Sequence, residues 1–97
     1  WFLDGRVSCV FGTHTHIQTN DARILKEKTA YVTDLGMTGG HDGVIGVTLP
    51  SVIPRYLTGM PTRFEVCDEN IMLHGAVVSF DEETRQVVKI ELIKEYC

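Results

Sequence analysis

The spacing of hydrophobic residues changes along this chain and predicts two strands, then one helix, then further strands. Val7 to Phe11 is an almost continuous apolar run, as expected for a strand covered on both faces. Thr29 to Thr33 is a second run rich in β-branched and aromatic residues, bounded by charged residues. Residues 36–43 contain four glycines and predict a loop.

A helix is predicted from Leu49 to Leu57, because its apolar residues recur at intervals of three and four. Pro50 suits the first turn of a helix, whereas Pro54 removes one hydrogen bond from its interior. Gly59 and Pro61 supply the stop signal.

After Pro61 the hydrophobic pattern has a period of two, which is typical of strands. Polar turn residues at 68–70 and 81–84 separate three such segments, at 64–66, 71–78 and 86–93. We therefore expect a three-stranded antiparallel meander. Its covered side should consist largely of Phe64, Val66, Leu73, Val77, Val88, Ile90 and Leu92.

Composition narrows the possible classes of protein. The chain has 97 residues, of which 43% are hydrophobic, enough for one small domain. Its net charge of −4 argues against a strong electrostatic grip on nucleic acid. Three widely spaced cysteines suggest neither a disulfide framework nor a zinc knuckle. Without a membrane-spanning or signal segment, the chain is expected to be cytoplasmic, and its apolar start at Trp1 suggests a fragment.

The candidate chemistry lies in Gly12-Thr13-His14-Thr15-His16, directly after the first predicted strand. If the strand continues, His14 and His16 share one face, with Cβ atoms roughly 6–7 Å apart. Two-metal hydrolytic centres hold their ions about 3.5–4 Å apart, so each imidazole could bind one ion. A His-x-His pair also occurs by chance, so the residues alone leave a structural role open.

Four other polar residues have simpler interpretations. His41 is expected to be an exposed loop histidine, although with Asp42 it could bind metal or move a proton. His74 should be a packed or edge histidine within a strand. Asp34 should cap the turn that follows the second strand, although its carboxylate could instead bind a more distant group of the site. Cys9 should be a buried, inert thiol.

Several stretches of the chain together resemble the carboxy-terminal part of the bacterial YmdB-like metallophosphoesterases, a branch of the calcineurin-like phosphoesterase superfamily. The matching stretches are Asp-Gly-Arg-Val-Ser at 4–8, Gly-Thr-His-Thr-His-Ile-Gln-Thr at 12–19, Thr-Ala-Tyr-Val-Thr-Asp-Leu-Gly-Met-Thr-Gly at 29–39 and Arg-Phe-Glu-Val at 63–66. The resemblance covers nearly the whole chain. Gly40-His41 departs from it, since Pro-Tyr is expected there.

The resemblance implies an α/β (α+β) fold, namely the carboxy-terminal portion of a four-layer α/β/β/α sandwich around two metal ions, with iron, manganese or zinc. Residues 1–97 would be a single partial domain of that fold, with the missing amino-terminal portion as its partner. His14 would bind one metal and His16 the other. The remaining ligands and the catalytic histidine of the family lie upstream of the matched segment.

The leading hypothesis is therefore the carboxy-terminal fragment of a two-metal phosphodiesterase that hydrolyses phosphodiesters such as 2′,3′-cyclic nucleotides. The fragment alone should be inactive and marginally stable, or should self-associate as a homo-oligomer, without any membrane partner. The alternative is a non-catalytic metal-binding or protein-interaction module. A third possibility is that the histidines are structural.

Overall fold

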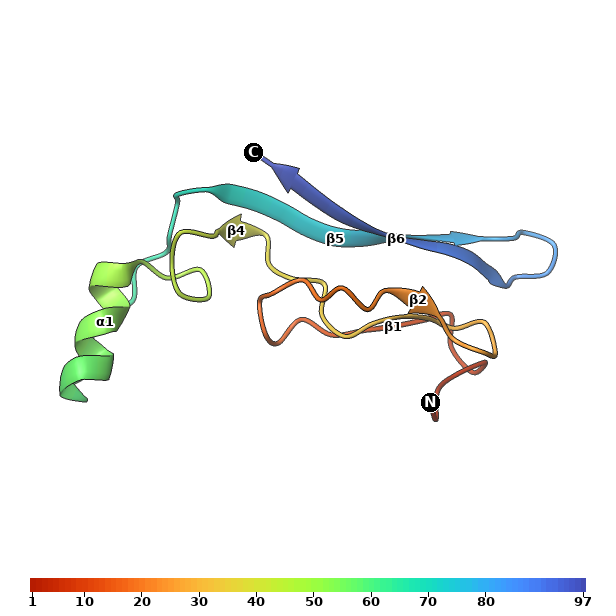
Figure 1. Ribbon diagram of the computed structural model, residues 1–97, viewed down its shortest axis with the longest axis horizontal. Helices are drawn as coiled ribbons and strands as arrows, with labels where there is room; N and C mark the ends of the chain where they lie inside the picture. Colours follow the sequence, from red (N-terminus) through yellow and green to blue (C-terminus); the bar gives the residue numbers. More distant parts are fainter.

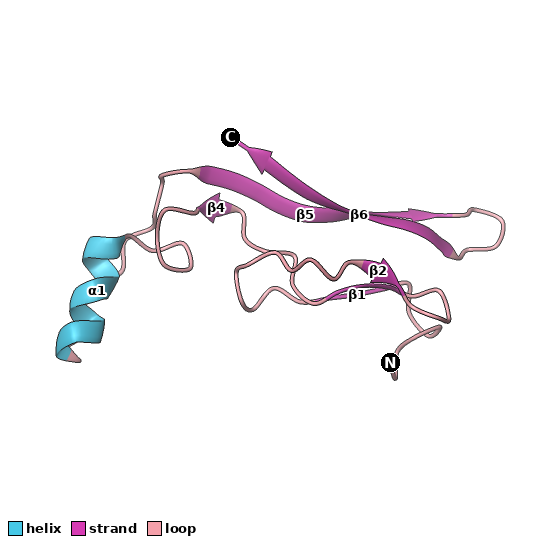
Figure 2. Ribbon diagram, viewed as in Figure 1, coloured by secondary structure: helices cyan, strands magenta, loops and turns pink.

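The computed structural model describes residues 1–97 as two small sheets and one helix (Figure 1). The hairpin of strands β5 and β6 lies over the sheet that contains β1 and β2, and helix α1 stands apart at one end (Figures 1 and 2). The principal extents are 55 × 30 × 17 Å, and the radius of gyration is 17.4 Å. A compact domain of this length would have a radius of gyration of roughly 13 Å. The chain is therefore elongated.

The first sheet combines a parallel and an antiparallel pair in the order β1-β3-β2. Strand β1 (Cys9–Phe11) runs parallel to β3 (Ala30–Val32), and β2 (Arg23–Ile24) runs antiparallel to β3. Strands β1 and β3 lie within the two predicted runs but are shorter. Strand β2 was not predicted, because two residues are too few to show a period.

The second sheet is the three-stranded antiparallel sheet that the sequence predicted, with a different first strand. It consists of β4 (Gly39–Gly40), β5 (Ile71–Phe80) and β6 (Val87–Tyr96), in that order. The prediction of a strand at 64–66 was wrong, since Val66 forms only an isolated bridge with Val47. The glycine-rich loop supplies the strand instead, and it packs so closely that a Cβ on Gly40 would collide with the carbonyl of Cys67.

The covered face of the hairpin was predicted only in part. Ile90 and Leu92 are half-buried, as expected, whereas Leu73 and Val77 are exposed and Met72 is buried. Strand β5 is apolar on both faces, so the alternation could not determine which face is covered. The other three residues predicted to be covered, Phe64, Val66 and Val88, are also exposed.

Helix α1 spans Leu49–Thr58, one residue longer than predicted. Gly59 ends it in the left-handed conformation, with φ of +70°, and donates its N–H to the carbonyl of Arg55. Only Ser51 and Val52 of the helix are buried, so most of its surface is exposed. At ten residues, this single helix is too short to cross a membrane.

Candidate functional site

The histidine pair lies on an irregular loop and not on a strand. Strand β1 ends at Phe11, and residues 14–17 form a bend in which His16 has a φ of +62°. The expectation that alternation along a strand places both imidazoles on one face is therefore wrong. His14 is exposed and His16 is half-buried. Their geometry depends on what holds the loop.

Asp34 holds this loop through Thr15, the residue between the two histidines. The Oδ2 atom of Asp34 accepts the backbone N–H of Thr15 at 2.6 Å and its hydroxyl at 2.8 Å. The two residues meet because parallel strands β1 and β3 end at the same edge, with Phe11 paired to Val32. The loop and Asp34 thus follow the carboxyl ends of neighbouring parallel strands.

The Asp34 side chain also caps its own turn, as the sequence suggested. Its Oδ1 atom accepts the N–H of Gly36 at 2.8 Å, and only 1% of the residue is exposed. Burial acts to raise the pKa of Asp34, but the bonds from Gly36 and Thr15 and the charge of His16 outweigh it. The net pKa is lowered, so the carboxylate is ionised near neutral pH.

A second carboxylate, Asp21, fixes the far end of the loop. Its oxygens accept the backbone N–H of Thr33 at 3.1 Å, the Thr33 hydroxyl and the Thr19 hydroxyl at 2.7 Å. The hydroxyls of Thr33 and Thr19, followed by the Thr33 N–H, lower the pKa of Asp21 to about 2. No local pattern in the sequence indicates this role, because Thr33 lies 12 residues away in the chain.

Gln18 joins the histidine loop to the hairpin above it. Its Nε2 atom donates to the carbonyl of Ile93 at 2.8 Å and to that of Gly75 at 3.2 Å. These two acceptors lie on β6 and β5, so the loop is fixed to both strands of the second sheet. Asp34, Asp21 and Gln18 together define the position of the segment that carries His14 and His16.

The ring of His16 is itself oriented by a backbone carbonyl. Its Nδ1 atom lies 3.0 Å from the carbonyl oxygen of Ile45. A carbonyl can only accept a hydrogen bond, so Nδ1 carries the proton, and in the neutral ring Nε2 keeps a free lone pair. Such an arrangement is typical of histidines that bind a metal through their other nitrogen.

The chain contributes at most part of a metal centre. No group of three or more His, Cys, Asp or Glu side chains is placed to hold an ion. Catalytic metal sites usually have about three protein ligands per ion, so further ligands would have to come from elsewhere. The anchored His16 and the exposed His14 fit the role of contributing ligands.

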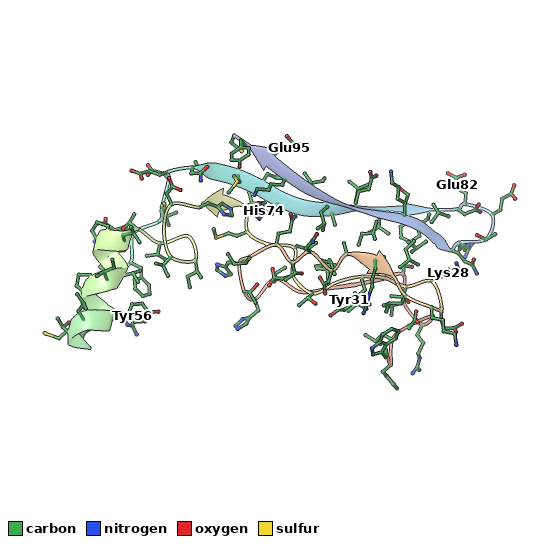
Figure 3. The ribbon with its side chains drawn as sticks, viewed as in Figure 1. Lys28, Tyr31, Tyr56, His74, Glu82 and Glu95 are labelled. Atoms are coloured by element: carbon green, nitrogen blue, oxygen red, sulfur yellow. The ribbon has the colours of Figure 1, made fainter.

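A second pair of histidines, His41 and His74, is in direct ring contact; His41 directly follows β4, and His74 lies in β5 (Figure 3). Their ring centroids lie 4.6 Å apart, with the planes at 61°, and His41 Nε2 lies 3.1 Å from the carbonyl oxygen of Met37. His41 is thus half-buried, and the expectation of an exposed loop histidine was wrong. The sequence could not show this contact, because 33 residues separate the two rings.

His74 is a packed histidine, as predicted. Neither of its ring nitrogens has a hydrogen-bond partner. Burial first, and then the charges of His41 and Lys94, lower its pKa. Cys9, predicted to be buried, is half-buried in β1, and burial raises the pKa of its thiol, as expected of an inert cysteine.

This architecture defines an α+β protein with a two-histidine loop at the carboxyl ends of the parallel strands β1 and β3. The chain belongs to the YmdB-like protein family, whose model matches residues 1–93. It is 50% identical, over 93 residues, to the 2′,3′-cyclic-nucleotide 2′-phosphodiesterase of Bacillus subtilis, covering 96% of this chain and 35% of that protein. The sequence-based assignment to the YmdB-like family is confirmed.

Two solved structures share the fold. A hypothetical protein from Thermus thermophilus has a TM-score of 0.91 and 37% identity, over 98% of this chain and 37% of that one. A phosphatase from Mycoplasma pneumoniae has a TM-score of 0.90 and 38% identity, over 97% of this chain and 34% of that one. The chain thus spans about a third of the length of the relatives it matches.

Proposed function

We propose that the complete protein is a metal-dependent phosphodiesterase, and that this chain contributes His14 and His16 as ligands to a centre of two ions. The observation that carries the proposal is the His16 ring, which is fixed at Nδ1 by the Ile45 carbonyl and free at Nε2. The similar protein from Bacillus subtilis is named a phosphodiesterase, which supports the same activity for the complete protein.

The residues of this chain orient the site. His14 and His16 would hold part of a two-metal centre, which would supply an activated water and stabilise negative charge on the leaving oxygen. Asp34 keeps Thr15, and thus the backbone between the two histidines, in one conformation. Its negative charge also favours the binding of cations nearby. The remaining ligands and the catalytic acid or base would lie outside this chain, which alone should be inactive.

The proposed substrate is a phosphodiester such as a 2′,3′-cyclic nucleotide. Imidazole ligands suit iron and zinc, and manganese is the third candidate, because carboxylates from the rest of the protein would favour it. The competing proposal is a non-catalytic metal-binding or interaction module. It has some support in the two-histidine ligand set and in the exposed apolar side chains of helix α1.

Metal reconstitution of the complete protein distinguishes these proposals. Metal-free protein is loaded with Fe²⁺, Mn²⁺ or Zn²⁺ and incubated with a 2′,3′-cyclic nucleotide and, separately, with a phosphomonoester. We expect the cyclic phosphodiester to be opened only with metal present, and a chelator to stop the reaction. Metal retention without hydrolysis of any phosphodiester would instead support the non-catalytic module.

A further inference from the structure

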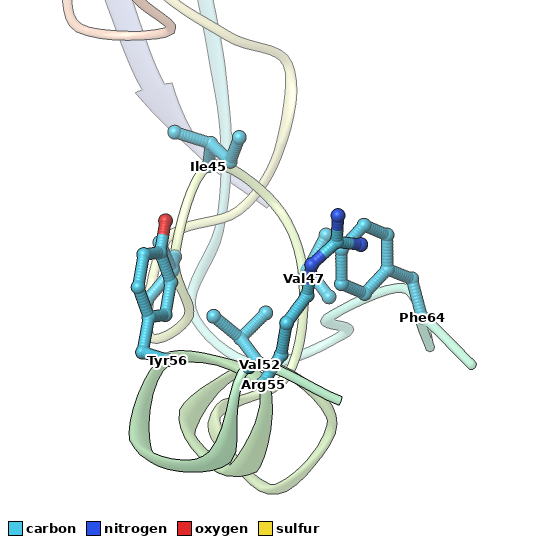
Figure 4. Close-up of a pocket in the computed structure, with 8 residues that line it drawn as sticks. Ile45, Val47, Val52, Arg55, Tyr56 and Phe64 are labelled. Atoms are coloured by element: carbon cyan, nitrogen blue, oxygen red, sulfur yellow. The ribbon is translucent and has the colours of Figure 1, made fainter. Parts of the chain in front are cut away.

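An open pocket of about 510 Å³ lies between helix α1 and the loop that precedes it. Its walls include Ile45 and Val47 from the loop, Val52, Arg55 and Tyr56 from the helix, and Phe64 beyond the helix (Figure 4). Small-molecule sites typically have volumes of about 300–1,000 Å³ and mostly apolar walls with a few polar groups. The pocket therefore has the size and lining of a ligand site.

This pocket shares a residue with the histidine loop. Ile45 forms part of the wall, and its carbonyl oxygen lies 3.0 Å from Nδ1 of His16. The pocket wall and the His16 ring therefore meet at Ile45. Ile45 has a φ of +48°, a conformation that few non-glycine residues adopt and that often marks functional segments.

The side chains at its rim fit a flat aromatic group next to an anion. Tyr56 stands on one side, with Arg55 and Phe64 on the other, as Figure 4 shows. The Arg55 guanidinium lies 5.3 Å from the centre of the Phe64 ring. It has no carboxylate partner, because the structure's one ion pair joins Lys89 and Glu91. The rim thus offers two aromatic rings and an unpaired positive charge.

We infer that this pocket holds the base of a nucleoside phosphodiester while its phosphate lies at the histidine site. The inference rests on the proposed function and adds the residues that select a nucleotide over a smaller diester. Stacking on aromatic side chains accepts any base, since every base has a flat π face. The pocket therefore favours nucleotides as a class and distinguishes weakly among the four bases.

The test compares a nucleotide with the same substrate without its base, using the complete, metal-loaded protein. The two substrates are adenosine 2′,3′-cyclic phosphate and methyl riboside 2′,3′-cyclic phosphate. In Tyr56→Ala, kcat/KM for the nucleotide should fall about 10-fold, mainly through KM. Turnover of the base-free substrate should stay within about twofold. Leu57→Ala, on the same helix and 80% exposed outside the pocket, is the matched control.

The other possible results distinguish a failure of the base subsite from a failure of the proposed function. An equal loss on both substrates, or no loss on either, would refute the base subsite and leave the phosphodiesterase proposal standing. If the unmutated protein hydrolyses neither substrate, the function fails, and the pocket is tested by equilibrium dialysis with adenosine 3′-monophosphate. Absence of binding, or binding unchanged in Tyr56→Ala, would then overturn the inference.

Two further measurements keep the test decisive. If Tyr56→Ala unfolds, Tyr56→Leu keeps an apolar side chain of similar reach and removes the ring. Light scattering shows whether the variants change the oligomeric state. A shift to smaller particles in Tyr56→Ala would show that the pocket is an interface between copies, and the assignment of a base would be wrong.

Discussion

Asp34 and Thr15 are joined twice, since one carboxylate oxygen accepts both the backbone N–H and the hydroxyl of Thr15, at 2.6 and 2.8 Å. This pair of hydrogen bonds spans 19 residues of sequence and fixes the backbone between His14 and His16. The conformation of the histidine loop is therefore set by the end of the neighbouring strand, and not by the loop sequence alone.

Asp34→Asn should weaken the site without removing a metal ligand. An amide in place of the carboxylate can keep one oxygen acceptor but loses the negative charge and one acceptor atom. We expect kcat/KM and metal content of the complete protein to fall about 10-fold or more, within the range seen for residues that orient ligands. Steady-state kinetics and metal analysis measure both. Glu82→Gln, in an exposed turn, is the control, and an equal loss there would contradict the specific role of Asp34.

Gly36 should tolerate alanine poorly, because two effects coincide there. Its φ is +87°, and a Cβ would lie 2.9 Å from Cβ of Gln18 and in collision with Nδ1 of His74. We expect Gly36→Ala to lower the free energy of unfolding by about 2–5 kcal/mol, the sum of left-handed strain and overpacking. Chemical denaturation measures this loss.

Gly59→Ala is the matched control for Gly36→Ala. Its φ is +70°, but nothing lies within 4 Å of the added Cβ. Only the backbone strain remains, so the loss should be about 1–2 kcal/mol. Equal losses in the two variants would show that close packing around Gly36 contributes nothing.

His74, whose ring nitrogens are buried, should make stability depend on pH. Its folded-state pKa lies below the ordinary value of about 6.5, because burial, then His41 and Lys94, disfavour the charged ring. Between the two pKa values the unfolded chain binds more protons than the folded one, so stability rises with pH across this window. The contribution is complete above about pH 6.5 and is lost as the pH falls toward the folded-state pKa.

Replacing His74 with leucine should remove that dependence. His41 and Lys94 are the charged groups that lower the pKa of His74. Its other close neighbours, Gln18 and Gly36, are uncharged. Melting temperatures of the metal-free protein at pH 5.5 and 7.5 measure the effect. His74→Leu should show a smaller difference between the two pH values than the unmutated protein. An unchanged difference would assign the pH dependence to other groups.

The chain on its own should self-associate. Trp1 and Phe2 are 81% and 79% exposed, and Tyr56 and Leu57 project from a helix that buries only two residues. Exposed apolar surface of this extent promotes association in water. Light scattering of the 97-residue chain tests this expectation. A monodisperse monomer with a cooperative melt would show that the chain covers its own core.

Local sequence patterns predicted the elements that have strong local signals. The helix at 49–58 has a regular period, a proline in its first turn and a glycine stop, so its bounds were correct within one residue. The two long strands β5 and β6 were predicted from their β-prone runs between polar turns, although β5 is apolar on both faces. The two-residue strands β2 and β4 carry no period at all, and their pairing depends on residues far away in the sequence.

The sequence identified His14 and His16 as candidates but did not predict the geometry of their loop. The spacing of His14 and His16 suggested a shared strand face, whereas the chain bends there under constraints from Asp34, Asp21 and Gln18. The hydrogen bonds from Thr15 to Asp34, from Thr33 to Asp21 and from Gln18 to Ile93 span 12 to 75 residues, so no local pattern contains them. The contact between His41 and His74 was missed for the same reason.

The central claim is that His14 and His16 bind metal in the complete protein, and metal stoichiometry tests it most directly. Plasma mass spectrometry should find about two ions per chain in the unmutated protein and a clear loss in the His14→Ala/His16→Ala variant. Each single variant should also cut phosphodiester hydrolysis by roughly 10²-fold or more, whereas His41→Ala should matter far less. Near-normal metal content and turnover in the double variant would contradict the account.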